Sequence, residues 1–232
     1  MRQEDRPLVR RLKLFAAMTQ ARFDALMQAA YLQNFPPQVD LIHEGDRADF
    51  LHVVTDGGVE LYARANGREA TMGIAWPVSA FILAAVFTDA VYLMSARTLM
   101  KSRILMIPAE AVREAFAEDP AFAKAAVCEL ARSFRAVVKA HKNLKLRSSV
   151  ERLANYLLRE LRRQGEGDKL TLATDKRTLA GLLGMTPENL SRAFNTLGPY
   201  GVAVEGSVIR LDKIEDLTRL AKPTPLIDDL EP

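Results

Sequence analysis

The chain has 232 residues, 49% of them hydrophobic, which is enough to bury the core of one large domain or of two small ones. Its formal net charge is +3 at pH 7, and its single cysteine, Cys128, excludes an intrachain disulfide framework and cysteine-held zinc or iron–sulfur sites. We therefore expect a globular protein of the reducing cytoplasm.

Neither targeting nor membrane insertion is predicted. The opening MRQEDRPLVRRL has no apolar signal-peptide core. The most apolar stretch, residues 72–96, is interrupted by Pro77 and Asp89 and offers no clean apolar window of about 20 residues. We expect no membrane partner.

The first third of the chain changes from helical to strand character. Apolar side chains in residues 8–35 recur at helical spacing, and from Phe35 to Pro108 short apolar runs alternate with turn residues. Asn66-Gly67 between two such runs is a strong hairpin signal. Strands at this spacing predict an antiparallel barrel or sandwich. The helical positions are Leu12, Phe15, Phe23, Leu26, Met27 and Ala30, and the predicted strands include 40–43, 50–55 and 59–64.

A short helix at 109–118 and a long one from Pro120 to about Arg147 follow. The long helix carries an apolar seam spaced 3, 4, 3, 4, 3, which is typical of a helix that pairs with another helix. Packing against its own β domain is the alternative, and we favour a homodimer. The seam consists of Val127, Leu130, Phe134, Val137, His141 and Leu144, with His141 interpreted as a tolerated polar seam residue.

The remaining segments predict a small winged domain. Ser148 to Glu151 is a capping box that opens a helix over 150–163, a turn at 165–168 follows, and 169–173 reads as a short strand. Thr174 or Asp175 caps the next helix. Residues 198–201 end the helical pair, and the runs 202–204 and 208–211 flank Glu205-Gly206-Ser207 as a compact hairpin.

The stretch from Leu179 to Leu197 is typical of a helix-turn-helix. Ala180 is small at the helix crossing, Gly184 sits at the turn where a positive φ favours glycine, and Leu190 can pack the second helix on the first. Thr186-Pro187-Glu188 then marks a helix start. In such motifs the N-terminal part of the second helix enters the major groove.

Charge and residue type on this helix support DNA binding. Arg192 can make a two-pronged bond to guanine and Glu188 can accept a hydrogen bond from a cytosine amino group. Residues 142–222 carry a net charge of +5, residues 1–141 a net charge of +1, and the last ten residues a net charge of −3. The basic excess therefore lies where phosphate neutralisation needs it, although an excess of this size is modest.

The chain resembles the Crp–Fnr family of bacterial transcription regulators in the order of its predicted parts. A helical start is followed by a β region, a long helix and a winged helix-turn-helix. The resemblance runs from about Leu12 to Lys222. It implies an α+β fold: a jelly-roll-like β-roll of the cyclic-nucleotide-binding type at 1–118, a dimerisation helix at 119–147 and a winged helix-turn-helix at 148–222. Residues 223–232, rich in proline and acidic side chains, are expected to form a flexible tail.

The pattern Glu188-x-x-Ser191-Arg192 is similar to the Fnr, FixK and Dnr branches, which recognise palindromes such as TTGAT-N4-ATCAA. The resemblance implies that Arg192 reads the guanine, Glu188 the opposite strand and Ser191 a thymine. The candidate phosphate contacts are Lys176, Arg177, Thr186, Asn189 and Asn195.

The sensor half departs from the cyclic-nucleotide regulators of the family. Those regulators carry a glutamate for the ribose and an arginine for the phosphate, whereas the matching places here hold Ala84 and, near the phosphate, Leu93-Met94. Residues 71–96 contain no Arg, Lys or Glu, and a buried phosphate without a cation is costly. We expect no cyclic nucleotide, and the single cysteine excludes the four-cysteine cluster of Fnr.

Residues 71–96 predict an apolar pocket in place of a cyclic-nucleotide site. Some branches of the family respond to nitric oxide or carbon monoxide, in part through heme, so heme with an axial histidine is a candidate cofactor. Another small apolar ligand, or no ligand with the stretch serving as core, stays open. The candidate lining residues are Trp76, Phe81, Leu83, Phe87, Tyr92 and Met94, and the candidate heme ligands are His43, His52 and His141.

The predicted function is that of a homodimeric regulator that binds double-stranded DNA, contacts RNA polymerase if it is an activator, and responds to nitric oxide, redox state or another small effector. One alternative is an effector-independent regulator, and another is a winged-helix sensor or scaffold that binds protein. An enzyme is not expected, because the chain has no nucleophile elbow and no phosphate loop, and its three histidines lie far apart in sequence.

Overall fold

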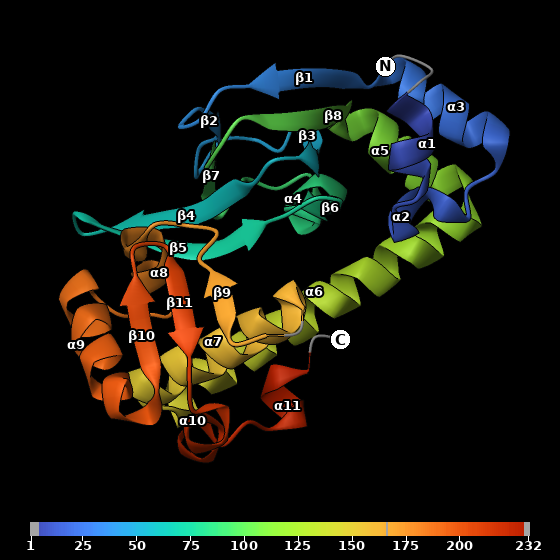
Figure 1. Cartoon of the computed structure of the whole chain (residues 1–232). Helices are drawn as coiled ribbons and strands as arrows, with labels where there is room; N and C mark the ends of the chain where they lie inside the picture. The colour runs from blue at the N-terminus through green and yellow to red at the C-terminus, as the bar shows by residue number, and fades with distance from the viewer. Residues whose placement is uncertain (1–4, 166, 230–232) are drawn as a thin grey trace. The chain divides into compact units, whose positions relative to one another are not determined.

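The computed structural model describes residues 5–165 and 167–229, and the chain divides into two compact units. The first unit ends at Ser133 and the second begins at Phe134, so the boundary falls within the long helix α6 (Pro120–Leu146). Each unit has its own buried apolar cluster. Figure 1 shows the course of the chain through both.

Two four-stranded antiparallel sheets build the first unit, with strand orders β1-β8-β3-β6 and β2-β7-β4-β5. Helices precede, interrupt and follow them. The strands are β1 (Tyr31–Phe35), β2 (Asp40–Ile42), β3 (Phe50–Asp56), β4 (Val59–Ala65), β5 (Arg68–Ala75), β6 (Ser79–Phe81), β7 (Ser95–Thr98) and β8 (Ser102–Pro108). The helices are α1 (Arg6–Arg10), α2 (Lys13–Ala16), α3 (Gln20–Ala29), α4 (Leu83–Thr88) and α5 (Ala109–Glu118).

The predicted β-roll and its hairpin are confirmed. Strands β4 and β5 pair from Val59↔Ala75 to Ala65↔Arg68, and the two residues between them have positive φ, 51° at Asn66 and 71° at Gly67. Positive φ at both central positions is the geometry of a type I′ turn, whose twist matches that of the flanking strands. Helix α5 and the start of α6 also lie where the sequence predicts them.

One prediction in this unit is wrong: residues 8–35 do not form a single helical region. The helical part is broken into α1, α2 and α3, and Tyr31–Phe35 form strand β1, paired with β8 from Tyr31↔Met106 to Phe35↔Ser102. The partner of β1 lies about 70 residues later in the chain. Its backbone hydrogen bonds therefore depend on tertiary structure, which overrides local spacing.

In the described part of the chain, the second unit contains the end of α6, five further α-helices and a three-stranded sheet. Its sheet has the order β10-β11-β9, and Leu153, Leu179 and Ile209 are among its fully buried side chains. The remaining elements are α7 (Ser149–Gln164), β9 (Lys169–Thr171), α8 (Lys176–Leu182), α9 (Pro187–Leu197), the 3-10 turn η2 (Gly198–Tyr200), β10 (Val202–Glu205), β11 (Val208–Leu211), α10 (Ile214–Ala221) and α11 (Pro225–Asp228).

Local capping signals are confirmed in this unit. Ser148 and Glu151 form both halves of a capping box at the start of α7. Of the two candidates for the cap of α8, Asp175 takes the place, and its Oδ1 accepts from the N–H of Thr178 at 2.7 Å. Strand β9 ends at Thr171, two residues before the predicted end.

The expectation of a poorly ordered C-terminal tail is wrong for residues 224–229. Pro225–Asp228 form α11, and the Asp228 side chain is buried in an ion pair with Arg147. The composition of this segment suggests disorder. The buried carboxylate of Asp228 instead holds it through the ion pair with Arg147, which is distant in sequence. The last part of the predicted tail, 230–232, and Glu166 of the predicted turn lie outside the described residues.

No helix in the described part of the chain combines the length and the apolar character needed to cross a membrane.

Candidate nucleic-acid interface

The turn between α8 and α9 has the geometry of a helix-turn-helix. Gly184 has φ +63°, and a side chain there would meet Leu144 of α6. The N–H of Met185 donates to the carbonyl of Ala180 at 2.9 Å, and Ala180 and Leu190 are buried where the two helices cross. Glycine is therefore favoured at this turn chiefly for its positive φ, because only the tip of the flexible Leu144 side chain would have to move for a Cβ.

Helix α9 begins as its sequence predicts. Thr186 is the N-cap, its Oγ1 accepts from the N–H of Asn189 at 3.3 Å, and Pro187 occupies the first turn. The N–H of Glu188 and the hydroxyl of Thr186 both donate to the Glu188 carboxylate and hold its pKa below the ordinary value. A carboxylate thus stands ionised at the positive end of the helix, where it is also stabilised by the helix dipole.

The two faces of α9 are sharply divided. Leu190, Ala193, Phe194 and Leu197 are buried in the core of the unit. The opposite face is exposed and polar, and it carries the predicted base-reading residues Glu188, Ser191 and Arg192 and the predicted phosphate contacts Asn189 and Asn195. The sequence prediction of which side chains face outward is therefore correct, while their contacts with DNA stay predictions.

Arg192 lies one turn after Glu188 on the exposed face. No ion pair between described residues engages its guanidinium, which leaves its donors free for a base edge. The hydroxyl of Ser191 donates to the carbonyl of Pro187 at 3.1 Å and keeps its lone pairs as acceptors. The exposed face of α9 can therefore donate hydrogen bonds through Arg192 and accept them through Glu188. Base pairs present both acceptors and donors in the major groove, so both capacities are needed.

Two further cations stand at the start of α8. Lys176 and Arg177 are exposed directly after the Asp175 cap, and the described ion pairs include neither of them. The arginine of the wing, the hairpin of β10 and β11, is instead paired. The Arg210 guanidinium on β11 binds Glu205 at 2.9 Å and Asp212 at 2.7 Å. The start of α8, and not Arg210, is thus the better placed cationic contact for phosphate.

Arg152, for which the sequence alone indicates no role, connects α7 to the helix-turn-helix through hydrogen bonds. Its Nε donates to the carbonyl of Leu183 at 2.8 Å, its Nη2 to that of Gly184 at 3.3 Å, and its Nη1 to that of Arg147 at 2.8 Å. The carbonyls of the turn lie 31 and 32 residues away along the chain, so no local pattern could have revealed these bonds.

The six predicted effector-pocket residues are mostly engaged in packing. Phe81, Leu83 and Tyr92 are buried, and the Tyr92 hydroxyl donates to the carbonyl of Phe50 at 3.1 Å. Met94 is half-buried. Trp76 covers Gly58, and the ring of Phe87 lies 5.0 Å from that of Phe116. These contacts favour the interpretation of the stretch as core.

The three histidines differ in environment. His43 and His141 are exposed, whereas His52 is 4% exposed, with its ring 5.5 Å from Phe81 and 6.4 Å from Phe50. Desolvation lowers the pKa of His52 to about 4, and its Nδ1 finds no hydrogen-bond partner within the described residues. A heme face could reach this ring only if the two phenylalanines moved apart, so the site does not fit heme as it stands.

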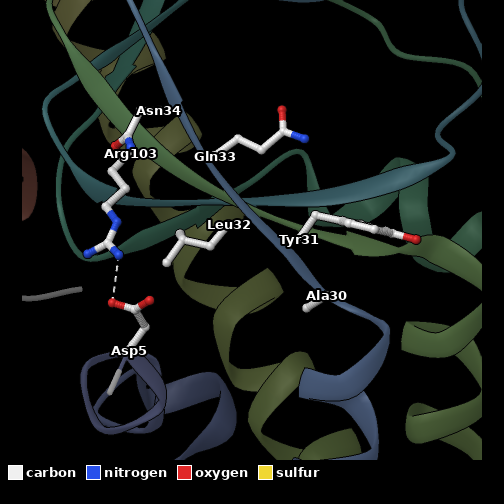
Figure 2. A pocket seen from close by; sticks show the side chains of 7 residues that line it. All are labelled: Asp5, Ala30, Tyr31, Leu32, Gln33, Asn34 and Arg103. Carbon is white, nitrogen blue, oxygen red and sulfur yellow. Dashed lines mark hydrogen bonds and ion pairs between the residues drawn. The ribbon is translucent and has the colours of Figure 1, made fainter. Parts of the chain in front are cut away.

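No cluster of three or more His, Cys, Asp or Glu side chains able to hold a metal ion occurs in the described ranges. Figure 2 shows a surface pocket of about 460 Å³ on the first unit, lined by Asp5, Arg103 and residues 30–34. The Arg103 guanidinium is already paired with Asp5 at 2.6 Å, and none of the predicted effector residues lines this pocket.

A β-roll followed by a winged helix-turn-helix with an exposed polar face defines a class of DNA-binding transcription regulators. The family model described as cyclic nucleotide-binding domain matches residues 32–119, and the one described as Crp-like helix-turn-helix domain matches residues 151–222. Together they span more than half of the chain, which belongs to the Crp–Fnr family of transcription regulators. No curated protein matches the sequence.

Several solved structures share this fold. A regulatory protein from Silicibacter pomeroyi DSS-3 that was proposed to bind cAMP is 26% identical, with 96% of this chain and 100% of that chain covered and a TM-score of 0.61. FixK2 from Bradyrhizobium japonicum is 21% identical over 84% and 98%, with a TM-score of 0.73. The c-di-GMP responsive regulator CLP from Xanthomonas campestris is 17% identical over 83% and 99%, with a TM-score of 0.72.

Proposed function

We propose that the protein is a homodimeric, sequence-specific regulator that reads palindromes of the type TTGAT-N4-ATCAA. The observation that carries the proposal is the exposed face of α9, where Arg192 takes part in none of the ion pairs between described residues and lies one turn after the ionised Glu188. Arg192 reads the guanine, Ser191 a thymine and Glu188 the opposite strand. Lys176 and Arg177, with Thr186, Asn189 and Asn195, hold the phosphates.

The dimer contact we propose is the apolar seam of α6. Four of its side chains are large, apolar and exposed: Val127 at 57%, Phe134 at 70%, Val137 at 66% and Leu144 at 46%. Leu130 packs partly against the core of the first unit, and His141 is exposed. Pairing this seam with that of a second copy removes the apolar surface from water. A two-fold dimer also matches the symmetry of a palindrome.

For the effector, we propose that the β-roll does not bind a cyclic nucleotide, in contrast to the ligand suggested for the Silicibacter protein. A small uncharged molecule, nitric oxide among them, is the class that the apolar segment 71–96 suits. Whether the regulator activates transcription through RNA polymerase depends on the position of its palindromic DNA site relative to a promoter. A winged helix that binds protein instead of DNA is distinguished by salt, because counterion release makes only DNA affinity fall steeply with added salt.

Fluorescence anisotropy with a labelled TTGAT-N4-ATCAA duplex and a scrambled duplex tests the proposal. We expect the palindrome to bind more tightly than the scrambled duplex, with an affinity that falls steeply as salt is added. Arg192→Ala removes one guanine contact per half-site, each of about 1 kcal/mol or more, so the palindrome should bind at least about thirtyfold more weakly. Binding of the scrambled duplex should change little.

Arg219→Ala is the matched control, because it removes an exposed arginine from α10, outside the helix-turn-helix. Its affinity for the palindrome should stay close to that of the parent. Equal palindrome binding by Arg192→Ala and the parent would contradict the groove assignment, and a flat salt dependence would favour the protein-binding alternative.

A further inference from the structure

The C-terminal segment of the second unit is held by a buried, two-pronged ion pair. Nη1 of Arg147 donates to Oδ1 of Asp228 at 2.7 Å and Nη2 to Oδ2 at 2.6 Å, and both side chains are only 7% exposed. The N–H of Thr224 donates to the same carboxylate at 2.7 Å. Arg147 lowers the pKa of Asp228 despite its burial, so the carboxylate is ionised at neutral pH.

This segment lies on one face of the end of α6. Lys139 donates to the carbonyl of Asp229 at 3.1 Å, and Asn143 accepts from Arg147 at 3.1 Å. Residues 139, 143 and 147 are spaced by four, so they share a face that differs from the seam through Val137, His141 and Leu144. Docking of the segment and pairing of the seam therefore use different surfaces of the helix.

Arg147 occupies the elbow between α6 and α7, directly before the Ser148 cap. Its carbonyl accepts from Nη1 of Arg152, whose other nitrogens bind the carbonyls of Leu183 and Gly184 in the turn before α9. A continuous path of hydrogen bonds thus leads from Asp228 through the elbow to the turn that orients α9. Asn155 adds a second tie, since its Nδ2 donates to the carbonyl of Ala221 at 2.6 Å.

We propose that Asp228 and Arg147 are positioning residues for DNA reading, and that the segment from Thr224 to Asp229 is a latch on the elbow. The proposal rests on the function proposed above, and neither side chain is expected to touch a base. Without Asp228 the buried Arg147 guanidinium has lost its counter-ion and must reach water, which opens the elbow. Fewer molecules then hold α9 in the orientation that reads DNA. The apparent Kd for the palindrome rises, because it equals the intrinsic Kd divided by the fraction of molecules in that orientation.

Asp228→Asn tests the latch, and Asp229→Asn is the matched control, because it makes the same charge change at the exposed neighbouring residue. We expect Asp228→Asn to bind the palindromic duplex about tenfold more weakly, with binding of the scrambled duplex changed less than twofold. Asp229→Asn should bind both duplexes as the parent does. Palindrome affinity equal to or tighter than that of the parent in Asp228→Asn would overturn the proposal.

A readout without DNA separates the latch from the proposed function. Amide hydrogen exchange at Gly184 and Met185, which bond to Gly181 and Ala180 across the turn, should be faster in Asp228→Asn than in Asp229→Asn. If the parent shows no palindrome preference, the proposed function fails, and equal exchange at the turn in the two variants overturns the latch. Should Asp228→Asn not fold, Arg147→Lys carries the same test, since it keeps the charge but loses the two-pronged geometry.

Discussion

At the scale of single residues, the buried His52 makes stability depend on pH. Its pKa is lowered to about 4 by desolvation, whereas an unfolded histidine titrates near 6.5. Between these values the unfolded chain binds more protons than the folded one, so the free energy of unfolding rises with pH. This stability is fully present above the unfolded pKa and is lost as the pH falls toward 4.

The expected size of the effect is about 2 kcal/mol between pH 7 and pH 5 from this one group. Urea unfolding at the two pH values, compared between the parent and His52→Phe, measures it, because phenylalanine cannot titrate and suits a site between two aromatic rings. His43→Phe is the control, since His43 is exposed and should leave the pH difference unchanged. A pH difference of equal size in His52→Phe would show that other groups cause it.

At the scale of elements, α6 presents a largely exposed apolar seam, and Phe134, 70% exposed, is more exposed than Val127, Val137 and Leu144. Placing a charge there puts an unpaired carboxylate into the contact between two copies, whose desolvation is costly. We therefore expect Phe134→Glu to shift the protein from dimer to monomer at micromolar concentration. Sedimentation equilibrium measures the change in mass.

Ala136→Glu is the matched control, because Ala136 is exposed on the same helix, lies two residues after Phe134 and is not a member of the seam. It should sediment as the parent does. A dimer that survives Phe134→Glu, or that dissociates equally in Ala136→Glu, would place the contact elsewhere.

Elements whose signals are local could be predicted from the sequence. The Asn66-Gly67 hairpin, the Ser148 capping box and the Thr186 cap each depend on residues within a few positions, and the structure contains all of them. Strand β1 and helix α11 could not be predicted, because β1 is defined by pairing with β8 and α11 by the Asp228 contact with Arg147, 81 residues apart.

The same division holds for the candidate interface. The outward face of α9 follows from helical periodicity, so Glu188, Ser191 and Arg192 could be named in advance. Arg152 and Arg147 could not, since their partners come from other elements of the domain. Buried polar networks of this kind are specified by tertiary structure, where each donor must find an acceptor to offset its lost hydration.

At the scale of the whole molecule, the fold suggests a cyclic-nucleotide sensor and the charges of the first unit argue against one. Three arginines lie around the α4 segment and the strand after it, and each is already paired. Arg47 and Arg113 bind Asp89 at 3.2 and 3.3 Å, and Arg97 binds Glu60 and Glu69, both at 2.8 Å. A cyclic phosphate would have to break one of these pairs or be buried without a cation.

We therefore expect neither cAMP nor hemin to stabilise the protein. A ligand present at 1,000 times its Kd adds about 4 kcal/mol to the free energy of unfolding, so 1 mM cAMP acting on a micromolar site would raise the urea midpoint unmistakably. For hemin, the covered ring of His52 predicts that this residue causes no shift of the absorption spectrum from that of free hemin. A raised midpoint with cAMP would mean that an arginine exchanges its carboxylate for the phosphate, and Arg47→Gln, Arg97→Gln and Arg113→Gln would then identify which one does. A shifted hemin spectrum that disappears in His52→Phe would mean that Phe50 and Phe81 part to admit the porphyrin. An uncharged effector needs no cationic partner and would leave the ion pairs of Arg47, Arg97 and Arg113 in place, which is why the charges of the first unit favour that class.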